Sequence, residues 1–122
     1  MWKDIFDILF SLSKTYLERK KENNKRLSNI FNRIADIIDS CIDLLEKDLY
    51  PHSYCQIMSN LSTSIVDELS DIMDMGKLVE LESLLFTCSK LELEYANRKD
   101  VKTIDTLINA SAKFRSLSIL YS

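Results

Sequence analysis

A run of charged side chains near the N-terminus is the first place in this sequence where chemistry could occur. Residues 14–33 carry seven Lys and Arg and two Glu, a local net charge of +5. Clustered cations of this kind bind phosphate groups, or they solvate a turn between two helices and form surface ion pairs. Residues 34–97 carry three basic and thirteen acidic residues, a net charge of −10. The molecule is therefore polarised, and both interpretations of the basic run stay open.

If the basic run binds phosphate, a membrane surface fits better than nucleic acid. The whole chain has a net charge of −3, and no motif for reading a nucleic-acid groove or stacking on bases is evident. The basic run follows an amphipathic segment with Trp2, Phe6 and Phe10. Cations beside an aromatic-rich amphipathic helix supply both electrostatic attraction and apolar insertion. Aromatic side chains at helical spacing are also common in a core, which is the alternative interpretation.

Residue types used in catalysis or metal binding are present but not grouped in a recognisable motif. His52 is the single histidine and stands beside Pro51, so we expect a turn residue rather than a catalytic base. Four carboxylates share the face of one predicted helix opposite its apolar stripe: Asp36, Asp39, Asp43 and Glu46. A di-iron bundle would need carboxylates in the core, so these predict a solvated face or a docking surface for a basic partner. We expect no enzymatic activity, no metal and no cofactor.

The three cysteines fit the apolar repeat rather than a metal or disulfide framework. Cys41, Cys55 and Cys88 are odd in number, widely spaced and placed where a small hydrophobe would fit. We interpret them as reduced core residues of a cytosolic protein. The N-terminus lacks the pattern of a secretory signal, and its apolar stretch is too short and too charged to span a bilayer as one ordinary helix.

Composition predicts one all-α domain over residues 1–122, an up-and-down bundle of four to five antiparallel helices. Gly76 and Pro51 are the only glycine and proline, which leaves few of the residues that hairpin turns require. The strongest helix prediction covers residues 25–47, where apolar positions recur at alternating spacings of four and three: Leu27, Phe31, Ile34, Ile38, Cys41 and Leu45. A first helix over residues 3–22 either continues into this one or ends in a tight turn at Asn23 and Asn24, which we favour because asparagine tolerates the left-handed conformation.

Sequence signals also predict where the later helices begin and end. Ser53 and Gln56 have the spacing of a capping box for a third helix, with Met58, Leu61, Ile65, Leu69 and Ile72 as its core. That helix is predicted to stop at Gly76 as a left-handed C-terminal glycine. A fourth segment carries Leu78, Leu81, Leu85, Cys88, Leu91 and Tyr95, and Asp100 is a candidate N-cap for a fifth with Ile104, Leu107, Ile108, Ser111 and Phe114. The fourth and fifth segments are either separate or one kinked helix.

The order of these features resembles a family of cell-death executioner domains. An amphipathic first helix, the junction "LERKKENNKRL" and the long apolar helix "LSNIFNRIADIIDSCIDLL" are similar to HeLo-type four-helix bundles. These include the bundle of mixed-lineage-kinase-like pseudokinases, fungal HeLo and HeLo-like domains, the coiled-coil domain of plant immune receptors and bacterial Bell domains. The similarity is clearest over residues 1–47 and continues as a helix pattern.

The resemblance implies a function as a membrane-permeabilising effector that oligomerises when a sensor domain or partner is triggered. It implies membrane insertion by Trp2, Ile5, Phe6, Leu9 and Phe10. It implies contacts to anionic lipid headgroups by Arg19, Lys20, Lys21, Lys25 and Arg26. A cytoplasmic protein that moves to the inner face of the cell membrane is then expected, either alone or as the N-terminal effector domain of a longer parent.

Two departures and one alternative accompany the resemblance. Some fungal members have a glycine-rich first helix, which this chain lacks, and Asp4 and Asp7 add charge to the inserting segment. Surface insertion or an oligomeric assembly therefore fits better than a simple spanning pore. The alternative function is a helical adaptor or regulatory module without membrane activity, which docks through the acidic face that contains Asp36, Asp39 and Asp43.

Overall fold

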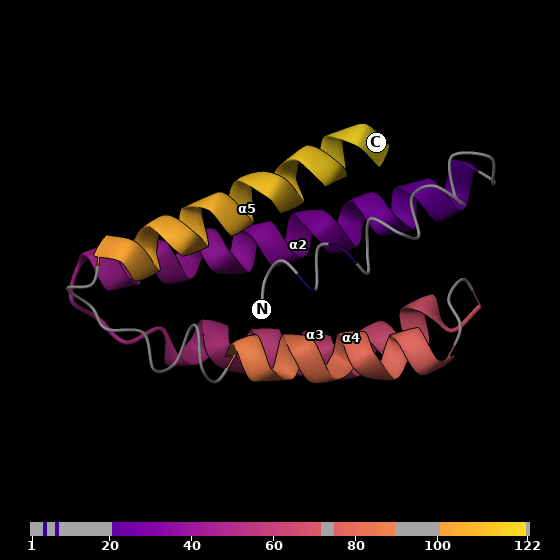
Figure 1. The fold of residues 1–122 in the computed structure, drawn as a ribbon, viewed down its shortest axis with the longest axis horizontal. Coiled ribbons are helices and arrows are strands. Elements are labelled where there is room, and N and C mark those ends of the chain that lie inside the picture. Colours follow the sequence, from indigo (N-terminus) through magenta and orange to yellow (C-terminus); the bar gives the residue numbers. More distant parts are fainter. Residues whose placement is uncertain (1–3, 5–6, 8–20, 72–74, 90–100, 122) are drawn as a thin grey trace.

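The chain folds as an all-α, up-and-down bundle, as predicted. The computed structural model describes residues 4, 7, 21–71, 75–89 and 101–121. Within these ranges the helices are α2 (Lys21–Glu46), α3 (His52–Leu69), α4 (Met75–Cys88) and α5 (Val101–Tyr121). Successive helices run in opposite directions, with α2 and α5 in one layer and α3 and α4 in the other (Figure 1).

Helix α2 supplies the largest part of the core. All six residues of its predicted apolar repeat are buried, and so are the flanking Ile30, Ile37 and Ile42. Phe31 is fully buried, and its ring lies 5.7 Å from that of Tyr121 on α5. The period of the apolar residues was sufficient to locate this helix because it is covered by neighbours along its whole length.

The predicted turn at Asn23 and Asn24 is wrong. Both residues lie inside α2, which begins at Lys21. Asn24 is half-buried, and Leu27 in the next turn is fully buried. Continued helical hydrogen bonding and burial of that turn outweigh the modest preference of asparagine for a helix end. Residues 8–20 lie outside the described part of the chain, so the prediction of one longer helix stays untested.

The left-handed residue that ends a helix is Asp48, not a glycine. Asp48 has φ of 57°. Its amide donates to the Leu45 carbonyl at 3.1 Å, and the Leu49 amide donates to the Leu44 carbonyl at 2.9 Å. This pair of bonds is a Schellman motif with aspartate in the position usually held by glycine. It closes α2 and turns the chain toward α3.

Both predicted boundary signals of α3 are wrong. Pro51 is the N-cap and no side chain caps the helix, whose first residue is His52. Ser53 is thus already helical, and the Gln56 amide donates to the Asn60 side chain at 3.1 Å. Helix α3 ends at Leu69, and Gly76 lies within α4 without a positive φ. The ring of Pro51 restricts the backbone φ at the start of α3. This preorganises the first turn of the helix without a side-chain cap.

Helices α4 and α5 are separate, because α4 packs against α3 whereas α5 packs against α2. The predicted break and N-cap at residues 96–100 lie outside the described residues, as do Ile72, Leu91 and Tyr95. Most predicted core positions of these helices are buried: Leu78, Leu81, Leu85, Leu107, Ser111 and Phe114. Ile104 is partly buried. Ile108 was predicted as core but is 45% exposed, because it lies beside the buried face of α5 that contains Leu107, Ser111 and Phe114.

The bundle consists of two antiparallel helix pairs, α2/α5 and α3/α4, joined mainly through α2 and α3. The α2–α5 contact is the most extensive and the α2–α3 contact the smallest of the three main helix contacts. Ser28 and Ser118 let α2 and α5 approach closely, since each buried hydroxyl donates to the main-chain carbonyl of the other, at 2.7 and 3.0 Å. Among the described helices, the junction between the pairs is therefore the smallest of the three main contacts.

Tyr121 gives a first testable prediction. Its side chain is buried, its hydroxyl has no hydrogen-bond partner within the described structure, and burial raises its pKa. We expect Tyr121→Phe to raise the free energy of unfolding by about 1 kcal/mol, because an unsatisfied buried hydroxyl is removed. Because the pKa of Tyr121 is higher in the folded state, the parent protein keeps its full stability below about pH 10 and loses stability as the pH rises further. The variant has no such ionisable group, so its free energy of unfolding should fall less in alkali. Urea denaturation at neutral and alkaline pH measures both effects, and a destabilised variant would contradict the prediction.

Candidate functional site

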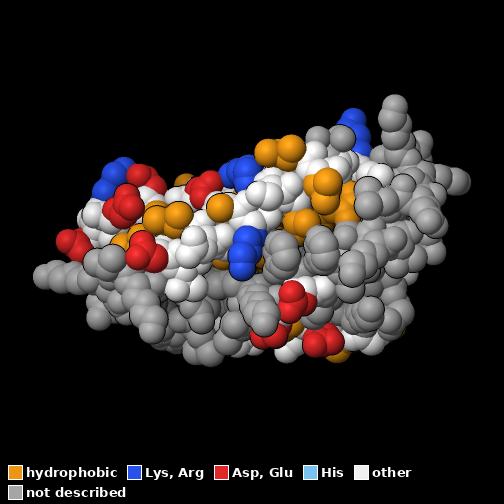
Figure 2. Space-filling view, turned by 45° about the horizontal axis from the view of Figure 1, so that its top comes forward, with side chains coloured by type: hydrophobic (Ala, Val, Ile, Leu, Met, Phe, Trp, Pro, Cys, Tyr) orange, Lys and Arg blue, Asp and Glu red, His pale blue; other side chains and the backbone are white. Residues whose placement is uncertain are grey.

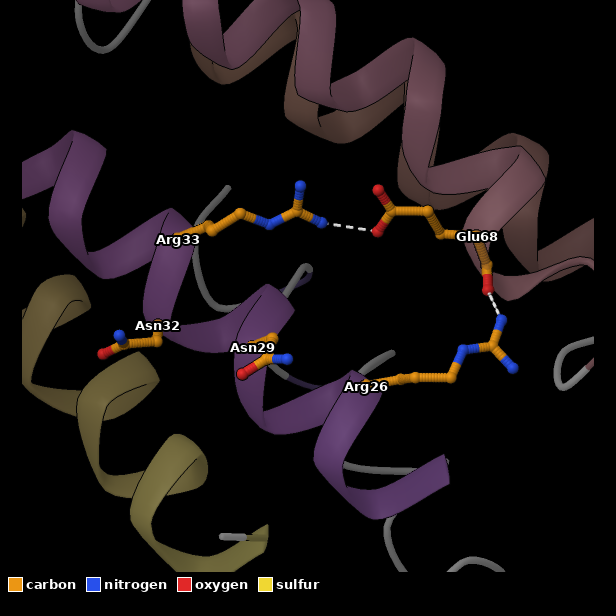
Figure 3. A pocket seen from close by; sticks show the side chains of 5 residues that line it. All are labelled: Arg26, Asn29, Asn32, Arg33 and Glu68. Carbon is orange, nitrogen blue, oxygen red and sulfur yellow. Dashed lines mark hydrogen bonds and ion pairs between the residues drawn. The ribbon is translucent and has the colours of Figure 1, made fainter. Parts of the chain in front are cut away.

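An open polar groove of about 520 Å³ lies between α2 and the C-terminal half of α3. Its lining residues carry charged or amide side chains: Arg26, Asn29, Asn32, Arg33 and Glu68. Arg26, Asn29 and Arg33 recur at spacings of three and four on one face of α2, so a regular helix presents them together. Figure 3 shows both arginines extending from α2 toward Glu68 on α3.

Ion pairs between α2 and α3 define the groove. The Arg26 guanidinium donates to both carboxylate oxygens of Asp71, each at 3.0 Å, and also to the main-chain carbonyl of Glu68. Arg33 donates to the Glu68 carboxylate (Figure 3). We call Arg26–Asp71 and Arg33–Glu68 the α2–α3 ion pairs. They fasten the two helices at the end opposite the Asp48 turn.

The electrostatics of the α2–α3 ion pairs follow from this geometry. The hydrogen bonds from Arg26 lower the pKa of Asp71 below its usual range. A lowered folded-state pKa contributes to stability at neutral pH, and that contribution disappears as the pH falls through the pKa of the folded form. The side chains are partly exposed, 38% for Arg26 and Glu68 and 46% for Arg33. Each pair is therefore weak and easily exchanged, because solvent screens the two charges.

Chemically, this groove can bind an anion. Two guanidinium groups and two side-chain amides offer the planar, multiple donors that phosphate and carboxylate groups accept from. In the structure the two guanidinium groups are directed at Glu68 and Asp71. An external phosphate would therefore have to displace these two carboxylates.

The structure describes only some of the predicted lipid-binding residues. Lys25 is exposed and Arg26 is held by α3. Lys21 lies in the first turn of α2, but its side chain is not described. The remaining predicted lipid-binding and inserting residues lie outside the described residues: Trp2, Ile5, Phe6, Leu9, Phe10, Arg19 and Lys20. Asp4 and Asp7 are helical and exposed.

The acidic face of α2 is partly occupied by α5. Arg115 pairs with Asp36 at 2.9 Å and with Asp39 at 2.7 Å, and it also donates to the Asn32 side chain. Hydrogen bonds to Asp36 and then Asp39 raise the pKa of the guanidinium. Two of the four carboxylates predicted to be a solvated or docking face therefore bind the chain itself. Asp43 pairs with Lys47 at 3.0 Å, and Glu46 is exposed.

A second groove, of about 470 Å³, lies between α3 and α4 and includes apolar side chains. Val79 and Phe86 line it and are 56% and 49% exposed. Further apolar side chains are exposed on α5: Ile108, Ile119 and Leu120. Figure 2 shows one face of the molecule, on which apolar side chains lie exposed between acidic and basic ones. These surfaces could contact a partner.

Within the described ranges, no group of His, Cys, Asp and Glu side chains is placed to hold a metal ion. His52 is exposed at the start of α3, and its ring lies 5.4 Å from that of Tyr50. Among the helices described, none combines the length and hydropathy needed to cross a membrane.

Comparisons with protein-family models, curated proteins and solved structures find no significant match. The function is therefore argued from the residues of this chain. Sequence reasoning noted Arg33 only as part of the basic run and gave Glu68 and Asp71 no role. Arg26 and Arg33 share one face of α2, whereas Glu68 lies in the last turn of α3 and Asp71 lies just beyond its end. The pairing became predictable only once α2 and α3 were known to be antiparallel neighbours.

Proposed function

We propose that this chain is a membrane-targeting effector domain of cell death or defence that acts without a cofactor or catalysis. The observation that carries the proposal is the order of two features along the sequence, an aromatic-rich N-terminal segment followed by a basic run that leads into the arginine-bearing face of α2. Aromatic and aliphatic residues over 2–10 precede the basic run, which leads into Lys25, Arg26 and Arg33. Apolar and cationic groups in this order suit an anionic lipid surface.

The α2–α3 ion pairs suggest how a resting state would be held. Asp71 and Glu68 occupy the guanidinium groups that would otherwise contact lipid phosphates. In the proposed mechanism, headgroup phosphates replace these two carboxylates, α2 and α3 separate at this end, and the N-terminal segment inserts. Exchange of one partly exposed partner for another is feasible because each pair is individually weak.

The proposed mode of action is insertion into the surface of the bilayer followed by self-association. Asp4 and Asp7 are exposed, and burying their carboxylates in hydrocarbon would be costly. In the proposal they stay at the headgroup level while Trp2, Phe6 and Phe10 enter the acyl boundary. The protein would rest in the cytoplasm and move to the inner face of the cell membrane when a sensor domain or partner activates it.

Vesicle binding and dye release test the proposal. The purified chain, alone and fused to a multimerising partner, is added to vesicles of anionic lipid and to vesicles of neutral lipid. We expect leakage from anionic vesicles that is lost in Phe6→Glu and in the triple variant Lys20→Glu, Lys21→Glu and Lys25→Glu. A control variant that reverses a single charge elsewhere on the surface, Lys113→Glu on α5, should leak like the parent.

The two variants separate the two proposed roles. Phe6→Glu should still bind anionic vesicles weakly but not release dye, because it keeps the cations and loses the apolar insertion. The triple variant should fail to bind. Absence of leakage and binding by every form, including the multimerised one, would refute the membrane proposal.

A second candidate function, a protein-interaction module, is favoured by the groove between α3 and α4. Its exposed Val79 and Phe86 offer apolar contacts that a partner could bury. A stoichiometric partner whose binding is lost in Phe86→Glu would favour this function. Charge reversal at Asp36 and Asp39 is a poor test, because it also breaks the Arg115 contacts between α2 and α5. Asp43 is the better probe of the acidic face.

A further inference from the structure

The outward face of α4 carries a stripe of side chains at the spacing used in helix packing. Its members recur at intervals of four, three and four residues: Met75, Val79, Glu82 and Phe86. The three apolar members are from 49% to 60% exposed, and Glu82 is partly buried. The opposite face of α4 is buried in the core. Because apolar side chains on two faces are typical of a helix that is covered on both sides, the outward stripe is suited to a further helix packed on α4.

The groove between α3 and α4 gives such a helix a place to lie. Val79, Glu82 and Phe86 line it from α4, and Ser62 and Thr63 line it from α3. The hydroxyls of Ser62 and Thr63 donate to a main-chain carbonyl of α3, at 2.6 and 3.5 Å. The α3 side therefore consists of small side chains whose hydrogen bonds are made within their own helix. An amphipathic helix in a groove of this kind contacts it through residues three and four positions apart.

The charge of α3 and α4 favours a basic helix in this groove. The two helices contain four acidic residues and one basic residue, Lys77. Glu82 lies in the groove, and Glu80 and Asp67 are exposed on the same helices. A neutral or acidic helix would offer these carboxylates no opposite charge. A helix with an apolar stripe and Lys or Arg beside it would match both the apolar side chains and their acidic surroundings.

The same chain contains a segment with these properties. Ahead of α2, apolar residues recur at the same intervals of four, three and four: Ile5, Leu9, Leu12 and Tyr16. Residues 14–25 add five basic residues and two acidic ones. Each copy of the chain therefore carries an acidic groove with apolar contacts and, elsewhere in its sequence, a basic segment with a matching apolar spacing.

We propose that the α3/α4 groove is a self-association surface that binds the basic segment, residues 1–25, of a second copy of this chain. The inference deepens the proposed function and rests on it in one respect, because the segment has to be available outside its own chain. The two contacting surfaces differ, so the contact is heterologous. Two joined copies still present one groove and one segment, and further copies can add in a row.

Binding of a labelled peptide to the full chain tests the contact in the absence of lipid. A fluorescent peptide of residues 1–25 is titrated with the full chain, and fluorescence anisotropy gives the dissociation constant. We expect saturable binding that weakens as salt is raised, because ions screen the charges. A control peptide with the same composition in scrambled order keeps the charge and loses the apolar spacing. It should not reach saturation over the same range of concentrations.

Substitutions in the groove identify where the peptide binds. Phe86→Glu removes an apolar contact, and Glu82→Lys opposes the basic residues of the peptide. Each should weaken binding by about tenfold or more. The matched controls lie on α5, where Leu120→Glu and Asp105→Lys make the same kinds of change at exposed positions and should bind like the parent. Circular dichroism shows that each variant is folded.

Sedimentation velocity of the full chain shows whether the contact forms between copies. At low salt we expect the average mass of the parent to rise with concentration, whereas Phe86→Glu should stay monomeric. A parent that binds the peptide but stays monomeric at every concentration would place the contact within one chain and overturn the proposal of self-association.

Three results of the peptide titration would also overturn the proposal. The first is no saturable binding at low salt. The second is equal binding of the scrambled peptide, which would mean attraction by charge alone. The third is equal binding by the parent and the two groove variants, which would place the peptide elsewhere on the surface. Peptide binding without vesicle leakage would refute only the membrane function, and leakage without peptide binding would refute only the groove contact.

Discussion

The Phe31→Ala variant is expected to lose about 3–5 kcal/mol of the free energy of unfolding. Phe31 is 0% exposed, stands in the middle of the α2 repeat and contacts the Tyr121 ring on α5. Truncation leaves a cavity in the most extensive helix contact, and a domain of this size has only about 5–15 kcal/mol of total stability. Urea denaturation followed by circular dichroism measures the loss.

Phe86→Ala is the matched control for this prediction. The same number of atoms is removed, but Phe86 is 49% exposed on α4. We expect a loss of less than about 1 kcal/mol, because the side chain is already half in water. Equal losses in the two variants would mean that the α2–α5 contact is not the main source of stability.

Removing the carboxylates of the α2–α3 ion pairs should strengthen binding to anionic vesicles by up to about tenfold, if the proposed function is correct. In the double variant Glu68→Gln and Asp71→Asn, Arg33 and Arg26 each lose the carboxylate that they bind in the α2–α3 ion pairs. A lipid phosphate would then reach either guanidinium group without first displacing that carboxylate. Sedimentation with vesicles of increasing anionic lipid content measures the change.

The matched control removes two carboxylates that lie elsewhere. Glu80 on α4 and Asp105 on α5 are exposed, so Glu80→Gln with Asp105→Asn changes the net charge by the same amount. A general electrostatic effect would strengthen binding equally in both double variants. That result would contradict a specific role for the α2–α3 ion pairs while leaving membrane binding itself intact.

The fold was predictable from sequence where burial decides it. The α2 stripe from Leu27 to Leu45 repeats for several turns, and every member is covered. Long periodic burial leaves few alternatives, so local preferences hardly matter. The same reasoning located most of the buried positions of α3 and α5.

Helix boundaries were not predictable, because they depend on local terms that are small and interchangeable. A capping box, a terminal glycine and an asparagine turn each contribute only about 1 kcal/mol. Pro51 starts α3 without the Ser53 cap, Asp48 takes a left-handed conformation after α2, and Gly76, which was predicted to end α3, lies within α4. Because these alternatives have similar energies, the packing around each helix end determines the residue at which the helix begins or ends.

The sequence predicted the basic residues of the candidate site but not their acidic partners. Arg26 and Arg33 belong to the basic run, and their charge pointed to anions. Their partners on α3 lie 35 to 45 residues further along the chain, and no local pattern joins them. Arg115 similarly reaches Asp39 across 76 residues. Such pairs depend on which helices pack against each other. The periodicity of a single helix does not predict its neighbours.

The pairing of α2 with α5 also has a consequence for synthesis of the protein. The Ser28–Ser118 hydrogen bonds join residues separated by 90 positions, so α2 leaves the ribosome long before its principal partner. Among the described helices, only α3 and α4 are made in that interval to cover the apolar stripe that includes Phe31, Ile34 and Ile38. The part of the stripe that α5 covers in the folded protein therefore stays without that cover until synthesis reaches α5, and it is a natural target for chaperones that bind apolar surface.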